Sequence, residues 1–411
     1  MNKYDVIVIG GGASGLMAAG RAAEKGKKVL LFEKNKNLGE KLKITGGGRC
    51  NITNAEEDHH ILLSKYGDAK HYLYSPFSKF GMSDTFSFFK KRGLPIIIQD
   101  RKRAFPETEN AHDVYKVLEN YIKKGGVEIH SSSNVDSVIG RDGIIEKVIV
   151  SGVEYVASSY ILATGGISHP ETGSTGDGFK WLKELGHKIE EPTPTIVPLA
   201  VSDSWVKKLS GVSLPHMKIT FFVNGIKKIS QKGELLFTHF GLSGPLILNI
   251  SKKVADFLHE GQVTALIDTY PDLDIGSLDK MITQIFDSNK NKMIKNVFKD
   301  IAPNGTSDVV LSLDKQIDPN IKIHSMTKEA RRQLTDLLKA LPVSITGLMG
   351  YDRAVIADGG VSLKEIDTRT MRSNLYKNLY ITGDLLHVSR PSGGFSLQLC
   401  WTTGYVAGNN A

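Results

Sequence analysis

The sequence predicts an α/β protein in which a domain with a mostly parallel sheet is interrupted by an inserted α+β domain. The first observation is a strand, a glycine-rich turn, a helix and a second strand within residues 4–33. The second is a pair of apolar strands at 160–166 and 378–384 that each run into glycine. The third is a change to hairpins and separate helices between residues 192 and 342. Together these features predict a Rossmann-like fold that the chain leaves once and then re-enters.

The opening unit has the order of a dinucleotide-binding motif. An apolar, β-branched run at Tyr4–Ile9 favours a buried parallel strand, and residues 10–15 after it fit G-x-G-x-x-G. We expect Gly10 to permit the tight turn, Gly12 to let a pyrophosphate approach the backbone, and Gly15 to let helix and strand pack closely. The start of the following helix offers free N–H groups and a partial positive charge to the phosphates.

Glu33 stands at the carboxyl end of the second strand. A carboxylate at this point can accept both hydroxyls of an adenosine ribose, and it would repel a 2′-phosphate. The site is therefore expected to take FAD or NAD(H) rather than NADP(H).

Residues 45–51 read Thr-Gly-Gly-Gly-Arg-Cys-Asn. Three successive glycines allow the backbone to lie against a ligand, and Arg49 with Lys41 and Lys43 supplies cations for a pyrophosphate. This stretch resembles the hallmark of a flavoprotein family that includes aminoacetone oxidase and the BaiN-like NAD(P)/FAD-dependent oxidoreductases. The resemblance implies FAD, rather than free NAD, in the first site.

Further motifs of that family recur along almost the whole chain. They are Arg-x-Phe-Pro at 103–106, Ala-Thr-Gly-Gly at 163–166, Gly-Ser-Thr-Gly-Asp-Gly at 173–178, Leu-Leu-Phe-Thr-His-x-Gly-Leu-Ser-Gly-Pro at 235–245 and the final strand ending in Gly-Asp at 383–384. Most of the family has Glu where this chain has Asp384, and the resemblance implies that this acid accepts a hydrogen bond from a ribityl hydroxyl. It also suggests Val135 as the contact for the adenine.

The residues expected to bind FAD come from these motifs and from the start of the last helix, whose N–H groups would face the N1–C2=O edge of the flavin. They are Gly10, Gly12, Ala13, Ser14, Gly15, Glu33, Lys34, Lys41, Gly46, Gly47, Gly48, Arg49, Cys50, Asn51, Val135, Ala163, Thr164, Gly165, Gly166, Thr175, Gly383, Asp384, Gly393, Gly394, Phe395 and Ser396.

Two residues are candidates for catalysis. His239 is the one group in its motif that titrates near working pH, although a lone histidine is more often structural. Arg103 could hold a substrate carboxylate or a cofactor phosphate, or be a surface cation. Arg49 would favour a thiolate at Cys50, but a small side chain packed near the cofactor is the preferred interpretation.

Composition narrows the class of protein. The 411 residues carry a net charge of +8, which a solvated surface explains more simply than an anionic partner such as RNA. The two cysteines, Cys50 and Cys400, form no C-x-x-C pair, so a dithiol mechanism is excluded and no metal site is expected. No apolar run is long enough to span a bilayer, and a strand that starts at Tyr4 leaves no room for a signal peptide. A cytoplasmic protein is expected.

The predicted domains are 1–191 and 343–411 for FAD and an inserted, substrate-side domain at 192–342. A Pro-rich stretch at 191–198 reads as a stiff linker, residues 55–124 as helical, and 138–158 as an antiparallel meander over the crossover. Within the insertion, Asn224-Gly225 predicts a hairpin, and helices are expected at 246–259, 277–299 and 327–340.

The resulting functional prediction is an FAD-dependent oxidoreductase that transfers a hydride between flavin N5 and a small molecule. Electrons would be exchanged with oxygen or with NAD(P)H, which would dock transiently because only one dinucleotide motif is present. An NAD(P)H-dependent reductase and an amine-type oxidase both stay open, as do the substrate and the oligomeric state. The alternatives are a redox sensor that binds flavin without turnover and a flavoenzyme that acts on RNA.

Overall fold

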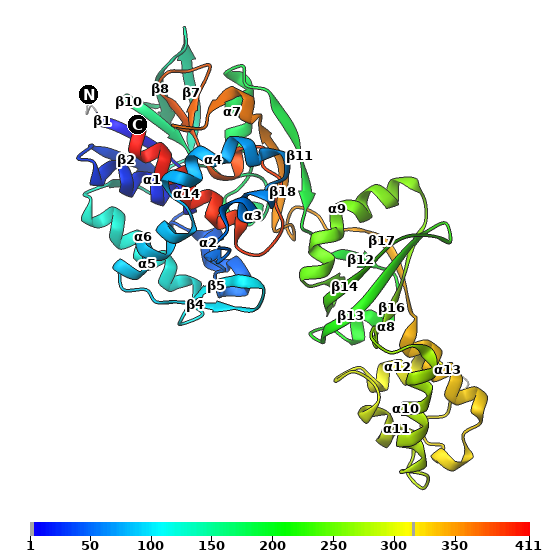
Figure 1. Ribbon diagram of the computed structural model, residues 1–411. Helices are drawn as coiled ribbons and strands as arrows, with labels where there is room; N and C mark the ends of the chain where they lie inside the picture. The colour runs from blue at the N-terminus through cyan, green and yellow to red at the C-terminus, as the bar shows by residue number, and fades with distance from the viewer. Residues whose placement is uncertain (1–3, 315–316) are drawn as a thin grey trace. The chain divides into compact units, whose positions relative to one another are not determined.

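The computed structural model describes residues 4–314 and 317–411 and divides into two compact units (Figure 1). The first unit comprises the chain up to Pro194 together with Ala354–Ala411, and the second comprises Thr195–Arg353.

A seven-stranded sheet forms the centre of the first unit, in the order β19-β20-β21-β10-β1-β2-β6. Its strands are β1 Tyr4–Ile9, β2 Val29–Phe32, β6 Glu128–His130, β10 Ala157–Leu162, β19 Ile366–Asp367, β20 Arg372–Ser373 and β21 Leu379–Ile381. The five from β21 to β6 run parallel, and β19 and β20 add an antiparallel edge. The order confirms the predicted Rossmann-type α/β fold, in which the ends of the central strands can meet a ligand.

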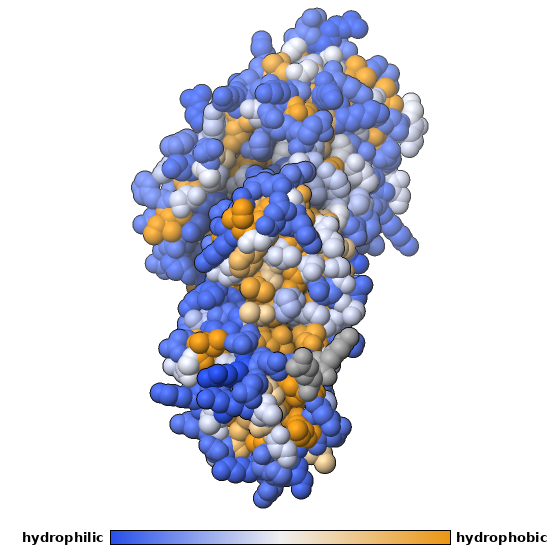
Figure 2. All heavy atoms as spheres, turned by 90° about the vertical axis from the view of Figure 1, so that its right-hand side faces the viewer, coloured by the Kyte–Doolittle hydropathy of each residue, from blue (hydrophilic) through white to orange (hydrophobic). Residues whose placement is uncertain are grey.

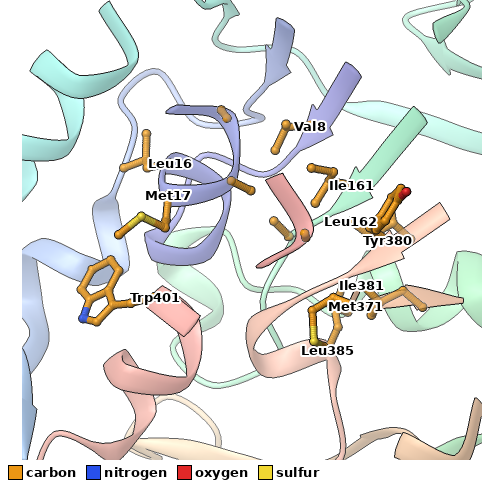
Figure 3. Packing of buried hydrophobic residues seen from close by; sticks show 14 of the residues in the cluster. Val8, Leu16, Met17, Ile161, Leu162, Met371, Tyr380, Ile381, Leu385 and Trp401 are labelled. Carbon is orange, nitrogen blue, oxygen red and sulfur yellow. The ribbon is translucent and has the colours of Figure 1, made fainter. Parts of the chain in front are cut away.

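Two helices that are far apart in the sequence pack closely on this sheet. α1 (Ala13–Glu24) and α14 (Phe395–Asn410) meet through Gly404 and Gly408, where an added Cβ would lie 2.3 Å from a backbone oxygen of α1. Figure 3 shows Leu16 and Met17 of α1 near Trp401 of α14, all three in the buried core of this unit. The pairing fixes the amino ends of both helices at the same edge of the sheet.

The other helices of this unit are α2 Glu40–Ile44, α3 His59–Ser64, α4 Lys70–Lys79, α5 Met82–Lys91, α6 Ala111–Lys124 and α7 Asp177–Glu184. The expected crossover meander is also present, as β7 Val135–Arg141, β8 Ile144–Val150 and β9 Val153–Tyr155. One expectation was wrong. Residues 55–124 are not wholly helical, because β3 Thr53–Asn54, β4 Ile96–Gln99 and β5 Arg103–Pro106 form an antiparallel sheet. The three successive isoleucines at 96–98 favour a strand over a helix.

The second unit is a closed six-stranded barrel with helices. Its strands are β12 Leu199–Val201, β13 Ser213–Val223, β14 Ile226–Thr238, β15 Gly241–Ser243, β16 Val263–Asp268 and β17 Leu341–Leu348. Its helices are α8 Ser204–Lys208, α9 Pro245–Glu260, α10 Ile275–Asp287, α11 Ile294–Val297, α12 Ser307–Leu313 and α13 Lys328–Lys339. The hairpin predicted at Asn224-Gly225 joins β13 to β14, with both residues at positive φ. The single helix expected at 277–299 is instead two helices, α10 and α11.

The borders of the insertion differ from those predicted. β11 (Ile189–Thr195) pairs with β18 (Ile356–Val361), so the proline-rich stretch is partly a strand. β17 pairs with β12 and β16, which places the residues after 342 in the barrel rather than in the first unit. Leu341, Val343 and Ile345 alternate with more exposed residues, as in a strand that turns one face to a core.

Figure 2 shows hydrophilic side chains over most of the face in view, with hydrophobic residues gathered in small patches between them. Across residues 4–314 and 317–411, the helices are all too short or too polar to cross a membrane.

Candidate functional site

Two adjoining cavities lie at the carboxyl ends of β1, β2 and β10 in the first unit. Both are lined by Gly10, Glu33, Thr164 and Gly173, so together they make one elongated cleft. We call its two parts the Trp181 half and the Asp384 half. Trp181 lines only the first of them, and Asp384 lines only the second.

The three glycines of the turn have different surroundings: Gly10 and Gly15 pack closely against the backbone of the protein, and Gly12 faces open space. An added Cβ at Gly10 would lie 2.5 Å from the carbonyl oxygen of Ala163, and one at Gly15 would lie 1.9 Å from that of Gly10. A Cβ at Gly12, which lines the Asp384 half, would meet nothing within 4 Å. Gly12 is therefore the position at which a ligand can reach the backbone.

Two helix starts converge on the Asp384 half. α1 begins after Gly12 with no side-chain cap and no acidic residue in its first turn, and Ala13 and Ser14 line the cleft. α14 begins after Gly394, also without a side-chain cap, and Ser396 lines the same half. Free N–H groups and the positive ends of two helix dipoles therefore favour an anionic ligand here.

Glu33 is held in a fixed position between the two halves. Its carboxylate accepts hydrogen bonds from the N–H of Gly11 and of Asn35, each at 2.8 Å. Burial raises the pKa of Glu33, and the two N–H groups offset this rise in part.

The Trp181 half combines an apolar wall with one ion pair. Val135, the first residue of β7, is buried and lines this half. Lys34 Nζ donates to Asp177 Oδ2 at 2.8 Å and also to the hydroxyl of Thr175. All three of these polar residues line the cavity.

A chain of charged side chains lies at the Asp384 half. Lys41 Nζ donates to Ser168 Oγ at 2.5 Å and lies 3.6 Å from Asp384 Oδ2. The other carboxylate oxygen of Asp384 accepts a hydrogen bond from Arg390. Burial would raise the pKa of Asp384, but the charges of Arg390 and Lys41 outweigh it and lower the pKa. Arg390 and Ser168 were not predicted as site residues; for Arg390 the available signal was that it is the one Lys, Arg, Asp or Glu in residues 385–394 before the final helix.

The structure does not bring the Thr-Gly-Gly-Gly segment to the cleft as expected. Thr45 lines the Asp384 half, but six predicted contacts do not: Gly46, Gly47, Gly48, Arg49, Cys50 and Asn51. Arg49 is drawn away because its guanidinium donates to Gln99 Oε1 at 2.7 Å, pairs with Glu109 and stacks on Phe105. Burial raises the pKa of Cys50 to about 12, so the side chain is a packed thiol rather than a thiolate.

The remaining predicted residues fall into two groups. Ala163, Thr164 and Gly165 line the cleft, whereas Gly15, Gly166, Gly383, Gly393, Gly394 and Phe395 lie outside its lining. Of the two catalytic candidates, Arg103 belongs to the first unit but does not line the cleft, and its Nε donates to the carbonyl of Asp100. His239 belongs to the second unit, where it is exposed and its ring packs against Phe240.

One buried polar atom of the cleft has no partner. Thr164 Oγ1, which lines both halves, has no hydrogen-bond partner among the described residues. Buried polar groups normally make hydrogen bonds, so a polar ligand in the cleft would satisfy this atom. Within the described part of the chain, no three His, Cys, Asp or Glu side chains are grouped to hold a metal ion.

Residues 4–410 match the family described as HI0933-like protein Rossmann domain. The chain belongs to the HI0933-like family. The match confirms the resemblance predicted from the sequence, and with it the class of flavoprotein oxidoreductases.

Individual relatives resemble this HI0933-like chain over its whole length. A ribosomal RNA dihydrouridine synthase of Haemophilus influenzae is 29% identical over 99% of this chain and 98% of its own. A 3-dehydro-bile acid delta(4,6)-reductase of Clostridium scindens is 28% identical over 100% of this chain and 99% of its own. Among solved structures, 3-ketosteroid delta1-dehydrogenase from Sterolibacterium denitrificans superposes with a TM-score of 0.56 at 13% identity, over 100% of this chain and 99% of that one. This last likeness shows a shared fold.

Proposed function

We propose that this chain is an FAD-dependent reductase that delivers a hydride to a carbon–carbon double bond conjugated with a carbonyl group. The observation that carries the proposal is the cleft. Glu33 is fixed between its two halves, and two uncapped helix starts and Lys41 lie in its Asp384 half. This donor set suits a long ligand that contains a ribose, a diphosphate and an electron-accepting ring.

The side chains present fit FAD at each part of the cleft. Glu33 would accept the hydroxyls of the adenosine ribose, and Val135 would lie against the adenine in the Trp181 half. The open space at Gly12 and the free N–H groups of α1 would receive the diphosphate. Thr164 Oγ1, which has no partner among the described residues, would gain one.

The ring would then occupy the Asp384 half. Bound FAD supplies hydride transfer at N5, and the chain supplies the charge around the ring. The positive end of α14, next to Ser396, favours the negative charge that a flavin carries when reduced. Cys400 lines the same half, and burial raises the pKa of its thiol to about 12, so it presents an uncharged surface.

The names of the relatives support this choice of bond. One describes the formation of dihydrouridine, and the other describes a delta(4,6)-reductase of a 3-dehydro bile acid. A uracil ring and a 3-oxo-4,6-diene steroid both hold a carbon–carbon double bond in conjugation with a carbonyl group, which polarises that bond toward a hydride. We infer the same kind of bond in the substrate of this chain, with NAD(P)H docking transiently to return the electrons.

A uracil base within RNA is the second candidate substrate, in place of a free small molecule. A groove formed by α1, α4, α5, α6 and α14 favours it, because five cations and only two acids line that groove: Arg21, Lys79, Lys91, Arg92 and Lys124, against Glu24 and Asp84. Lysine and arginine side chains bind the phosphate backbone of nucleic acids. The net charge of +8 acts in the same direction.

The roles predicted for His239 and Arg103 stay predictions. If His239→Gln leaves turnover of the identified substrate intact, His239 is neither its acid nor its base.

Anaerobic mixing tests the proposal. The FAD-loaded chain is first reduced with NADH and with NADPH in separate samples, and it is then mixed with a 3-oxo-4,6-diene steroid or with a uridine-rich RNA. At least one of these is expected to restore the yellow absorbance, and mass spectrometry should find a product with two added hydrogens. A saturated steroid and an RNA that lacks uridine are the controls. The proposal would be contradicted if neither substrate reoxidised the reduced flavin and only admitted oxygen did. It would also be contradicted if an amine, and not NAD(P)H, bleached the flavin.

A further inference from the structure

Three charged residues in the Asp384 half form a chain that runs from the cleft into the protein. Lys41 lines the cleft, and its Nζ lies 3.6 Å from Asp384 Oδ2. The other oxygen of Asp384 accepts a hydrogen bond from Arg390 Nη2. The exposed fractions of the side chains are 23% for Lys41, 17% for Asp384 and 2% for Arg390. Of the three side chains, that of Lys41 is therefore the most exposed.

Arg390 holds three segments together. Its Nε donates to Ser396 Oγ at 3.0 Å in the first turn of α14, and its Nη1 donates to the carbonyl of Val388 at 2.7 Å. The third contact, to Asp384, reaches the turn at the end of β21. A buried guanidinium is tolerated only with such partners, so Arg390 fixes Asp384 against the start of α14.

The chain of charges does not balance. Lys41, Asp384 and Arg390 by themselves carry an excess of one positive charge in a partly buried place, where salt screens it less than at the surface, and the carboxylates of Glu33 and Glu40 line the same half of the cleft. Both oxygens of Asp384 already lie against these cations. These contacts make Asp384 an anchor for Lys41, and the expectation that Asp384 also accepts a hydrogen bond from a ribityl hydroxyl stays a prediction, because each carboxylate oxygen can accept more than one hydrogen bond.

We propose that Lys41, Asp384 and Arg390 set the reduction potential of the bound flavin. Lys41 supplies the excess charge that stabilises the anionic reduced ring, and Asp384 and Arg390 are positioning residues. Two electrons and one proton, delivered as a hydride from a donor of the NAD(P)H class, convert the oxidised ring into that anion. The inference rests on the proposed FAD site, and it assigns the potential to named side chains rather than to the helix dipole alone.

The test is the midpoint potential of the FAD-loaded protein, measured by equilibration with a reference dye and without any substrate. Lys41→Met removes the excess charge, so the equilibrium for reduction should become at least tenfold less favourable, a shift of about 30 mV to more negative potential. Asp384→Asn removes the anion and should shift the potential by a similar amount in the opposite direction. Lys41→Arg keeps the charge and should stay close to wild type.

Lys36→Met is the matched control, because Lys36 is an exposed lysine outside the cleft lining. Its potential should equal that of wild type. The inference is overturned if Lys41→Met and Asp384→Asn shift the potential in the same direction, or if Lys41→Met leaves it unchanged. Weaker FAD binding by Lys41→Met at an unchanged potential would make Lys41 a diphosphate contact, which also overturns it.

These outcomes are distinct from failure of the proposed function, which would appear as a wild-type chain that takes up no FAD. If Asp384→Asn does not fold, as judged by thermal unfolding, the comparison of Lys41→Met with Lys41→Arg decides the question alone.

Discussion

The carboxylate of Glu33 accepts a hydrogen bond from the backbone N–H of Gly11 at 2.8 Å. This bond ties the end of β2 to the glycine turn after β1, and a second bond from Asn35 N–H holds the same carboxylate. The acid is therefore fixed in position before a ligand arrives. Preorganisation of this kind lowers the entropic cost of binding.

Glu33→Ala should weaken FAD binding. Hydrogen bonds to a charged group contribute about 1.5–3 kcal/mol, so the dissociation constant should rise roughly ten- to a hundredfold. Titration of the flavin-free chain with FAD, followed by flavin fluorescence, measures this directly. Glu107→Ala changes an exposed glutamate outside the cleft lining and is the control. An affinity equal to that of wild type would remove Glu33 from the ribose site.

The same residue should make the stability of the flavin-free chain depend on pH. Burial raises the pKa of Glu33 above its ordinary value of 4.5. The folded chain then binds this proton more tightly than the unfolded chain does. The contribution of Glu33 to the free energy of unfolding is therefore fully present below 4.5 and is lost as pH rises through the raised pKa.

Urea unfolding of wild type and Glu33→Gln at acidic and neutral pH isolates this effect, because other groups titrate equally in both proteins. The free energy of unfolding of wild type, relative to the variant, should fall as pH rises across that window. If the difference in free energy of unfolding between the two proteins stayed constant or grew as pH rises, the raised pKa of Glu33 would be contradicted.

Two glycines of one turn should respond in opposite ways to the same added methyl group. Gly12→Ala places its Cβ in open space in the cleft, so folding should be preserved while FAD binding falls at least tenfold. Gly15→Ala would place its Cβ 1.9 Å from a backbone oxygen, so it should destabilise the fold by about 1–3 kcal/mol or more. Thermal unfolding and FAD titration of both variants separate the two effects. Equal loss of stability in both would show that Gly12 serves packing.

Neither cysteine should react in the native protein. Burial raises the pKa of both Cys50 and Cys400 to about 12, and the thiolate is the reactive form. A thiol reagent at mildly alkaline pH should therefore find both thiols only after denaturation. Rapid labelling of Cys50 in the native state would instead support the first interpretation, in which the neighbouring Arg49 favours a thiolate at Cys50.

How far the sequence predicted this structure depends on the range of the interactions involved. Spacing along a single strand–turn–helix unit encodes the glycine turn and Glu33, and these were found without a structure. The position of Arg49 was not, because its partners Gln99 and Glu109 come from a hairpin that forms only in the folded chain. Arg390 was missed for a different reason: its partners Asp384 and Ser396 are each six positions away, but whether side chains at that spacing meet depends on the fold of the turn after β21 and of the start of α14.

The end of the insertion could not be predicted either. β17 belongs to the barrel because Leu199 of β12 pairs with Leu348, almost 150 positions away in the printed sequence. An alternating pattern shows that residues 341–345 can form a strand, but it does not specify which sheet they join.

The measurement that tests the central claim most directly is the flavin content of the purified chain after reconstitution. We predict a yellow protein that holds one FAD per chain, released intact on denaturation, with Gly12→Ala losing most of it. The assignment of the cleft to FAD would be contradicted by a wild-type chain that binds no flavin in excess FAD, although a cooperative thermal unfolding transition shows that it is folded.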